Sequence, residues 1–319
     1  MQFNKVPTLG MTLLTALACA PAAAQSGVTM YGYLDIGIEK RSGQVARVGP
    51  GLNNWLGWRG SERLDGDTEA FFMTEMRFNP DTGSQERPGK LMQGETTVGL
   101  RNAALGSLRL GRALTPLWHD IWKYDPWINS GVNASLAAYQ TGSYTSDGVH
   151  DAEIGYADFS RFDNAVFYIT PSVGGWSAHV AADLERDVAD QRRPAGLSLN
   201  YAADGIGAQF AYERNANNDR IGLAAVSWES GGVKLMASGA RVAPRLGRAE
   251  RVAMVAASWR VGNNTLRTGY GRNFLLDQDK LSAGVVHHLS VRTGLYADLY
   301  RERSLADATG AALGIMHTF

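Results

Sequence analysis

The sequence contains one cysteine in 319 residues, Cys19, so no disulfide can form within the chain. Charge of one sign is also lacking, because 31 Lys and Arg residues balance 31 Asp and Glu residues. No basic excess therefore points to nucleic acid as a partner. Beyond the first residues, no apolar run approaches the about 18–20 residues that a membrane-spanning helix requires. A water-soluble protein and a membrane β-barrel both remain open.

The N-terminal segment has the layout of a cleaved secretory signal. Residues 1–24 contain one cation, Lys5, then an apolar stretch that includes residues 11–20, then three alanines. A lipoprotein signal that uses Cys19 is the alternative, but Ala16 stands where such signals carry a leucine-like residue. We expect a signal peptide at 1–24 and one exported domain at 25–319.

Alternation of apolar and polar residues is the main pattern in the rest of the chain. Over residues 28–39, Val28, Met30 and Leu34 share one parity, while Asp35 and Glu39 lie on the other. Successive side chains of a strand point to opposite faces of the sheet, so one face is apolar and the other can meet water. The same pattern recurs at residues 69–78, 176–185 and 293–300.

The connections between these segments alternate between short turns and longer polar stretches. The short connections are expected at residues 63–67, 102–106, 171–175, 203–205, 229–232, 261–264 and 290–292. The long connections are expected at residues 41–53, 79–90, 113–158, 186–195, 214–219, 241–251, 273–280 and 302–310. These connections join sixteen strands. Short turns on one rim and long loops on the other are typical of an outer-membrane barrel with an even number of strands.

Aromatic residues support the same interpretation. Apolar-face aromatics beside the short turns are expected to form a girdle at the membrane boundary. They are Trp176, Tyr201, Trp228 and Trp259. The final strand ends on Phe319 and should pair with the first strand, because an open sheet edge is not tolerated in hydrocarbon. The fold class predicted is an all-β, 16-stranded antiparallel transmembrane β-barrel with short periplasmic turns and long extracellular loops.

Several segments resemble one known family, in the right order along the chain. They are "SGVTMYGYLDIGIE" near the start, "LGWRGSERLDGDTEAFFMTEMRFN", "VGLRNAALGSLRLGR", "DNAVFYITPSVGGWSAHV", "LSAGVVHHLSVRTGLYADLY" and the closing "LGIMHTF". From about residue 27 to 319 the chain resembles trimeric general porins of Gram-negative bacteria, especially those of the β-proteobacteria. The resemblance implies a homotrimer in the outer membrane, with a third extracellular loop folded into the lumen as a constriction.

The longest connection, at about residues 113–158, fits the role of that loop. Structureless connections of this length are rare in compact domains and are usually functional. By the resemblance, its first part should lie near the narrowest point of the lumen. The candidate constriction residues of the loop are Trp118, His119, Asp120, Lys123 and Asp125. Trp122 and Tyr124, which lie in the same stretch, are also expected near the narrowest point.

The resemblance also implies a basic wall opposite the loop. By inward parity we expect Arg59, Arg77 and Arg109 on this wall, with Arg112 at its junction with the loop. An arginine keeps its charge at any working pH, and charges lining a pore select ions. The alternative is that each arginine merely pairs with a lumen acid such as Glu75 or Asp35.

This chain departs from the family pattern at two cationic positions. Trp55 stands where relatives often carry Arg, and the position aligned near Gly94, where they often carry a second Arg, has no cation. Four tryptophans, at positions 55, 118, 122 and 127, lie in or near the expected constriction. These changes would weaken anion preference and favour solutes with flat apolar faces.

The predicted function is passive diffusion of small hydrophilic solutes and ions through an outer-membrane porin. A substrate-specific channel with an aromatic-rich loop is the alternative, and a plugged adhesin or structural barrel is a remote one. Outer-membrane lipids and lipopolysaccharide are the other expected partners. We expect no enzyme activity, because none of the histidines comes with a Ser or Asp at a recognised spacing for catalysis. No cofactor and no metal are expected either; His287 and His288 do not form a metal site, since neighbours on a strand point to opposite faces.

Overall fold

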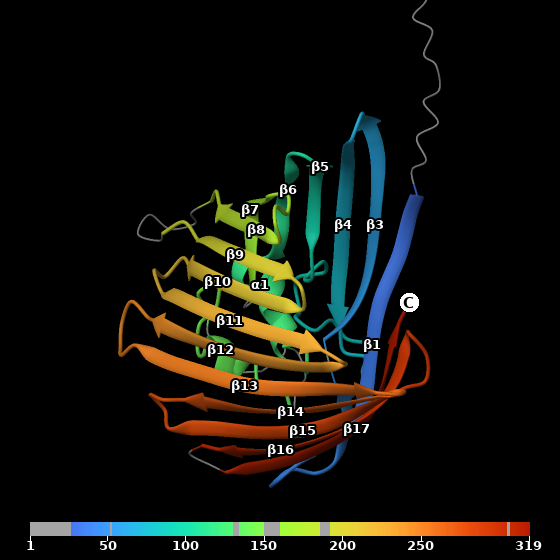
Figure 1. Ribbon diagram of the computed structural model, residues 1–319, viewed down its shortest axis with the longest axis vertical. Coiled ribbons are helices and arrows are strands. Elements are labelled where there is room, and N and C mark those ends of the chain that lie inside the picture. The colour runs from blue at the N-terminus through green and yellow to red at the C-terminus, as the bar shows by residue number, and fades with distance from the viewer. Residues whose placement is uncertain (1–26, 52, 130–133, 150–159, 186–191, 305–306) are drawn as a thin grey trace, which may run out of the picture.

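Most of the described chain lies in antiparallel strands that form one sheet closed on itself (Figure 1). The computed structural model describes residues 27–51, 53–129, 134–149, 160–185, 192–304 and 307–319. The expected signal peptide at residues 1–24 lies outside the described residues. None of the described helices is long and apolar enough to cross a membrane.

The strands follow one another around the sheet in chain order, each hydrogen-bonded to its neighbour. The first half contains β1 (Gly27–Arg41), β2 (Arg47–Pro50), β3 (Asn54–Asp65), β4 (Thr68–Phe78), β5 (Thr96–Asn102), β6 (Gly106–Leu114), β7 (Arg161–Ile169) and β8 (Trp176–Asp183). The second half contains β9 (Ala195–Ala203), β10 (Ile206–Arg214), β11 (Arg220–Ser230), β12 (Val233–Ala243), β13 (Glu250–Val261), β14 (Asn264–Asn273), β15 (Gln278–His288), β16 (Thr293–Arg303) and β17 (Ala308–Thr318).

The described sheet contains seventeen separate strand segments, but two of them, β2 and β3, occupy one place in the barrel wall, so the wall has sixteen strands. β2 and β3 both pair with the same edge of β1, β2 over residues 36–39 of β1 and β3 over residues 27–33. They therefore act as one wall strand interrupted at residues 51–53. The predicted 16-stranded antiparallel barrel is confirmed.

The barrel closes where the last strand meets the first. Residues 310–318 of β17 pair with residues 33–41 of β1, and Figure 1 shows the C-terminus beside β1. Beyond the strand, the backbone N–H of Phe319 donates to the Gly32 carbonyl, 3.2 Å away, and the Phe319 carbonyl accepts a bond from the Gly32 N–H in return. A Cβ atom at position 32 would collide with the Phe319 ring, so glycine is needed at this seam.

The outer face is apolar, as the alternation predicts. Val28, Met30 and Ile38 of β1 are more than half exposed, whereas Asp35 and Glu39 are buried on the inner side. The expected girdle tryptophans Trp176, Trp228 and Trp259 are also exposed at strand ends beside short turns. Such rings settle at membrane–water boundaries.

The contrast in loop length is weaker than the sequence indicates. The β14–β15 connection spans only residues 274–277, which is no longer than turns on the opposite rim. The polar residues 278–280 were assigned to a loop by composition but belong to β15. Composition alone does not separate a loop from a strand with a polar face, because both are rich in polar residues.

Candidate functional site

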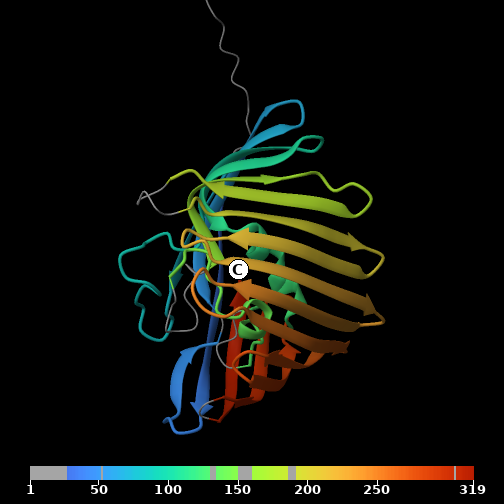
Figure 2. The same cartoon turned by 90° about the vertical axis from the view of Figure 1, so that its left-hand side faces the viewer.

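The longest connection, residues 115–160 between β6 and β7, lies inside the barrel, and we call it the inner loop (Figure 2). Of this loop, residues 130–133 and 150–159 lie outside the described part. It contains α1 (Pro116–Ile121), the 3₁₀ turn η1 (Trp122–Tyr124) and α2 (Ala138–Thr141). Pro116 occupies the first helical turn, where its missing N–H costs nothing.

Apolar contacts hold the inner loop against the wall formed by β9–β14, which we call the covered wall. Leu117 and Ile121 of α1 are fully buried and belong to one apolar cluster with Ile221 and Leu223 of β11. Farther along the loop, Leu136 belongs to a second apolar cluster; its other members are Trp127, Ala134, Tyr139, Met236, Met254 and Ala256. The inner faces of these strands therefore carry buried apolar side chains where these parts of the loop lie on them.

Small residues on β14 allow the loop backbone to approach closely. An added Cβ at Gly269 would come within 2.6 Å of Leu136 Cδ1, and one at Gly271 would collide with Tyr139. Real Cβ atoms do not make such contacts. The glycines at these two positions are thus part of the loop-binding surface.

Buried polar groups on the covered wall complete the attachment. Gln209 Nε2 donates to the Leu117 carbonyl at 2.9 Å, and the Tyr144 hydroxyl donates to Glu213 at 3.0 Å. The Ser143 hydroxyl donates to Glu250 at 2.6 Å. Because buried polar groups that lose a partner are costly, these bonds fix the position of the loop as well as adding to its stability.

Asp125 organises the loop from within and faces away from the lumen. It is 3% exposed, and its carboxylate accepts bonds from the Ser135 hydroxyl at 2.7 Å and from the backbone N–H groups of residues 127, 129 and 136. Burial raises the pKa of the Asp125 carboxyl, although these donors act in the opposite direction. The sequence placed Asp125 near the narrowest point as a lumen acid; its carboxylate instead serves as a scaffold for the loop.

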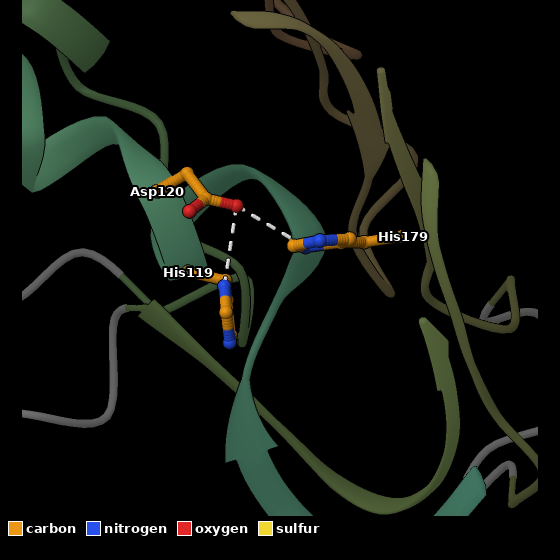
Figure 3. A group of neighbouring side chains, drawn as sticks. All are labelled: His119, Asp120 and His179. Atoms are coloured by element: carbon orange, nitrogen blue, oxygen red, sulfur yellow. Dashed lines mark hydrogen bonds and ion pairs between the residues drawn. The ribbon is translucent and has the colours of Figure 1, made fainter. Parts of the chain in front are cut away.

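Asp120 is also buried, but it faces the neighbouring strand β8 (Figure 3). One carboxylate oxygen, Oδ2, lies 3.2 Å from His119 Nδ1 and 3.2 Å from His179 Nδ1. The other oxygen accepts a bond from Lys123. Burial alone would raise the pKa of Asp120, but His119 and Lys123 lower it below its usual range. With both acids buried, the described loop presents Lys123 and Trp122 to the lumen, and not the acidic pair that the sequence suggested.

The four tryptophans expected at the constriction divide into two groups. Trp118 and Trp127 are 5% and 2% exposed, because they are packed between the loop and the covered wall. Trp122 is exposed on the loop. Trp55 lies on the opposite wall, where its ring stacks on Tyr33 at 4.7 Å and carries the Arg77 guanidinium at 4.9 Å on a ring face.

The expected basic residues lie together on the inner faces of β3, β4 and β6. Arg77 pairs with Glu75 at 3.0 Å and Arg109 with Glu95 at 2.7 Å. Arg112 is buried; it donates to the Gln93 carbonyl at 2.9 Å and pairs with Asp163. Arg59 is exposed to the lumen, and its guanidinium lies 5.3 Å from the centre of the Tyr31 ring.

The cluster contains two further cations, which parity counting along the strands did not identify. Lys90 pairs with Asp163 at 2.8 Å, and buried Arg161 donates to the Gly94 carbonyl. The register of β6 shifts between Gly111 and Ala113, and Asn164 has a positive φ of 48°. Parity counted from the middle of the strands therefore does not extend to Arg161. An Arg at the first position of the strand after the loop is the signal that could have found it.

Gly94, which lies near the position where the family resemblance led us to expect a cation, is constrained by its neighbours. An added Cβ there would collide with Glu75 Oε1, while the Gly94 N–H donates to the Glu75 carbonyl at 2.9 Å. Arg161 thus brings a guanidinium from β7 to the place where the sequence lacks one at position 94.

A closed barrel with an apolar exterior, a charged inner wall and a loop folded inside defines a transmembrane β-barrel of the outer-membrane channel class. The chain matches the family of Gram-negative porins over residues 10–307, and it belongs to that family. It is an outer-membrane protein whose strands cross the membrane many times.

Named relatives agree with this assignment. An outer membrane porin protein of Bordetella pertussis is 27% identical over 252 residues, which cover 68% of this chain and 61% of that protein. Outer membrane porin protein 32 of Delftia acidovorans is 28% identical over 228 residues, which cover 69% and 60%. The matched regions thus span about three fifths of these two relatives. The solved anion-selective porin from Comamonas acidovorans has a TM-score of 0.78 at 21% identity, covering 92% of this chain and all of that one.

Proposed function

We propose that the protein forms a water-filled channel for passive diffusion of small hydrophilic solutes and ions across the outer membrane. The observation that carries this proposal is the division of the lumen. The inner loop covers one wall, and a cluster of arginines lines the other. Solutes are selected by size in the space between them and by the charge of the arginine wall.

The charge of the open wall favours anions in this proposal. Arg112 and Lys90 lie together on this wall and both pair with Asp163. Among the described residues, no carboxylate forms an ion pair with Arg59. The acids of the inner loop at 120 and 125 are buried, so they offset this excess little. The solved Comamonas protein is an anion-selective porin, which supports the same direction here.

A substrate-specific channel with an aromatic-rich constriction is less well supported. Two of the four tryptophans, Trp118 and Trp127, are packed away from the lumen and offer no ring face to a solute. The remaining pair, Trp55 and Trp122, lie on opposite sides, and Trp55 is already stacked between Tyr33 and Arg77.

The proposal includes a homotrimer in contact with outer-membrane lipids and lipopolysaccharide, and no enzymatic activity. The described histidines near the lumen, His119 and His179, contact a carboxylate, and neither bonds to a serine, threonine or cysteine side chain there. A nucleophile within hydrogen-bond reach of a base, as hydrolases need, is not formed at this place.

Conductance of the folded protein in planar bilayers across a salt gradient tests the proposal. We expect the flux to rise linearly with solute concentration and the channel to close in three steps, one for each subunit of a trimer. The sign of the reversal potential should show that anions are more permeant than cations. Zero conductance from correctly folded protein would overturn the channel function. Saturable flux of one solute class would favour the substrate-specific alternative, and a cation-selective potential would overturn the role given to the arginines.

A further inference from the structure

We infer that His119, Asp120 and His179 form a binding site for a divalent transition-metal ion of the Zn²⁺ class. Two of these residues are consecutive on α1, and the third lies on the inner face of β8, so the site joins the inner loop to the barrel wall (Figure 3). Sequence spacing predicts no such site, because His179 is far from the loop in the chain and reaches it only through the fold.

The donor atoms converge as a metal requires. One donor atom from each residue lies within 4.8 Å of the others. Asp120 Oδ2 is 3.2 Å from Nδ1 of each histidine, and ligands of a tetrahedral Zn²⁺ ion bound at about 2.0–2.1 Å are about 3.3 Å apart. The two imidazole rings are edge to face with centroids 4.7 Å apart. A small rotation of the partly exposed His119 side chain would bring its nitrogen into place.

His179 supplies an independent indication of a ligand. Its side chain is 8% exposed, and its Nδ1 atom has no well-aligned hydrogen bond among the described residues. That atom nevertheless lies 3.2 Å from Asp120 Oδ2. A buried ring nitrogen without an aligned donor or acceptor is costly, whereas a metal ion would satisfy its lone pair.

The chemistry of the donors selects the class of ion. Two imidazole nitrogens and one carboxylate oxygen suit Zn²⁺, Ni²⁺ or Cu²⁺, while Mg²⁺ and Ca²⁺ prefer oxygen ligands alone. The His119 side chain is 35% exposed, so water can reach this edge of the site and complete the coordination of an ion. A bound ion would therefore fasten α1 to β8 and add positive charge beside the constriction.

Lys123 opposes this site. Its ammonium group binds the second oxygen of Asp120 and lies next to the place of the ion. Removing the Lys123 charge should strengthen metal binding, because the ammonium group repels a cation and competes for the Asp120 carboxylate. Lys123 is half exposed and contributes no metal ligand, so its loss removes nothing that the ion needs. Removal of a ligand should therefore weaken metal binding, whereas removal of Lys123 should strengthen it.

Isothermal titration of ZnCl₂ into the folded full-length protein in detergent is the direct test. We expect one ion per chain and at least about tenfold weaker binding for His179→Ala, since loss of an outer-shell partner alone costs about 10–100-fold. Asp120→Asn should weaken binding in the same way, and Lys123→Met should tighten it severalfold. The matched control is His287→Ala, an exposed histidine on the outer face, which should bind as the unchanged protein does.

Two results would overturn the inference: unchanged protein without stoichiometric binding, or variants at 120 and 179 that bind as tightly as the control. Should His179→Ala fail to fold, Asp120→Asn and Lys123→Met still decide. A second arm measures bilayer conductance with Zn²⁺ or Mg²⁺, and we expect only Zn²⁺ to change it. This arm rests on the proposed channel function but the titration does not, so failure of one is distinguishable from failure of the other.

Discussion

Two walls of the same barrel, built from the same kind of strand, have opposite inner faces. On the covered wall, β9–β14, the inner face carries apolar residues such as Ile221 and Leu223, which the inner loop covers. On the wall formed by β3–β5, which we call the open wall, the inner face carries Trp55, Arg59 and Arg77. The outer faces of both walls are apolar.

The difference shows that the polarity of an inner face follows from what lies against it. Where water fills the lumen, charged and aromatic side chains line the strand. Where a segment of the chain displaces water, the strand is built as a protein core is built, with close packing and small residues at the points of contact. The residues that line a barrel interior therefore differ from one region to the next, according to whether water or a segment of the chain lies against the strand.

Adding a charge to each wall should separate the two most clearly. Ile221→Lys places an ammonium group in a fully buried apolar contact, where even a neutral polar group without a partner costs about 2–7 kcal/mol. We expect the inner loop to leave the wall, with a large rise in single-channel conductance and rapid tryptic cleavage within the loop.

The matched variant on the open wall is Ser61→Lys, which adds the same charge where no loop element packs. It should keep the loop protected from trypsin. Equal protease sensitivity of the two variants would remove the distinction between the walls.

Reversing a charge on the open wall should alter selectivity without moving the loop. Arg59→Glu replaces a lumen-exposed cation by an anion, so the reversal potential in a salt gradient should shift toward cations, with a severalfold change in the permeability ratio. Arg248→Glu makes the same substitution in the exposed β12–β13 connection and should shift the potential far less. Similar shifts in both variants would mean that net charge, and not the open wall, sets selectivity.

The stack of Tyr33, Trp55 and Arg77 should contribute a moderate part of the stability. Trp55→Ala removes one aromatic pair and one cation–π contact, together worth about 1–3 kcal/mol. Denaturant unfolding in detergent measures this loss, and Trp55→Phe, which keeps a ring, should lose less than half as much. If both substitutions cost the same, ring stacking is not what stabilises this part of the wall.

The smallest effect is expected at the polar attachment of the covered wall. Ser143→Ala removes one of the two bonds that Ser143 gives to Glu250, because the backbone N–H at 3.0 Å remains. We expect a loss of about 1 kcal/mol, seen as faster proteolysis of the inner loop with unchanged conductance. Ser143→Thr retains a hydroxyl and should behave as the unchanged protein; faster proteolysis there would point to packing and not to the bond.

The outer half of this architecture could be predicted from the sequence, and much of the inner half could not. Val28, Met30 and Leu34 meet lipid or a dry neighbour in any closed barrel, so alternation alone identifies their face. Asp125 illustrates the limit on the inner side. Whether its carboxylate points to water or to backbone N–H groups depends on a loop conformation that no local pattern encodes.

The candidate site shows the same limit. Arg59, Arg77 and Arg109 lie on the inner face, where parity counted from the middle of their strands puts them, and their role at the constriction stays a prediction. Arg161 was missed because a register shift and a positive φ at Asn164 interrupt the parity beside the loop. The meeting of His179 with Asp120 depends on where α1 packs, which is decided by tertiary contacts with the covered wall.

The pairing of β1 with β17 has a consequence for the order of assembly. This seam joins residues nearly the whole chain apart, such as Tyr33 and Met316, 283 positions distant. The inner loop, in contrast, packs on hairpins that follow it much sooner in the sequence, and the entropic cost of bringing segments together rises with their separation. The loop can therefore settle on a still open, curved sheet, and the seam then encloses it, so that no segment has to be threaded into a finished cylinder.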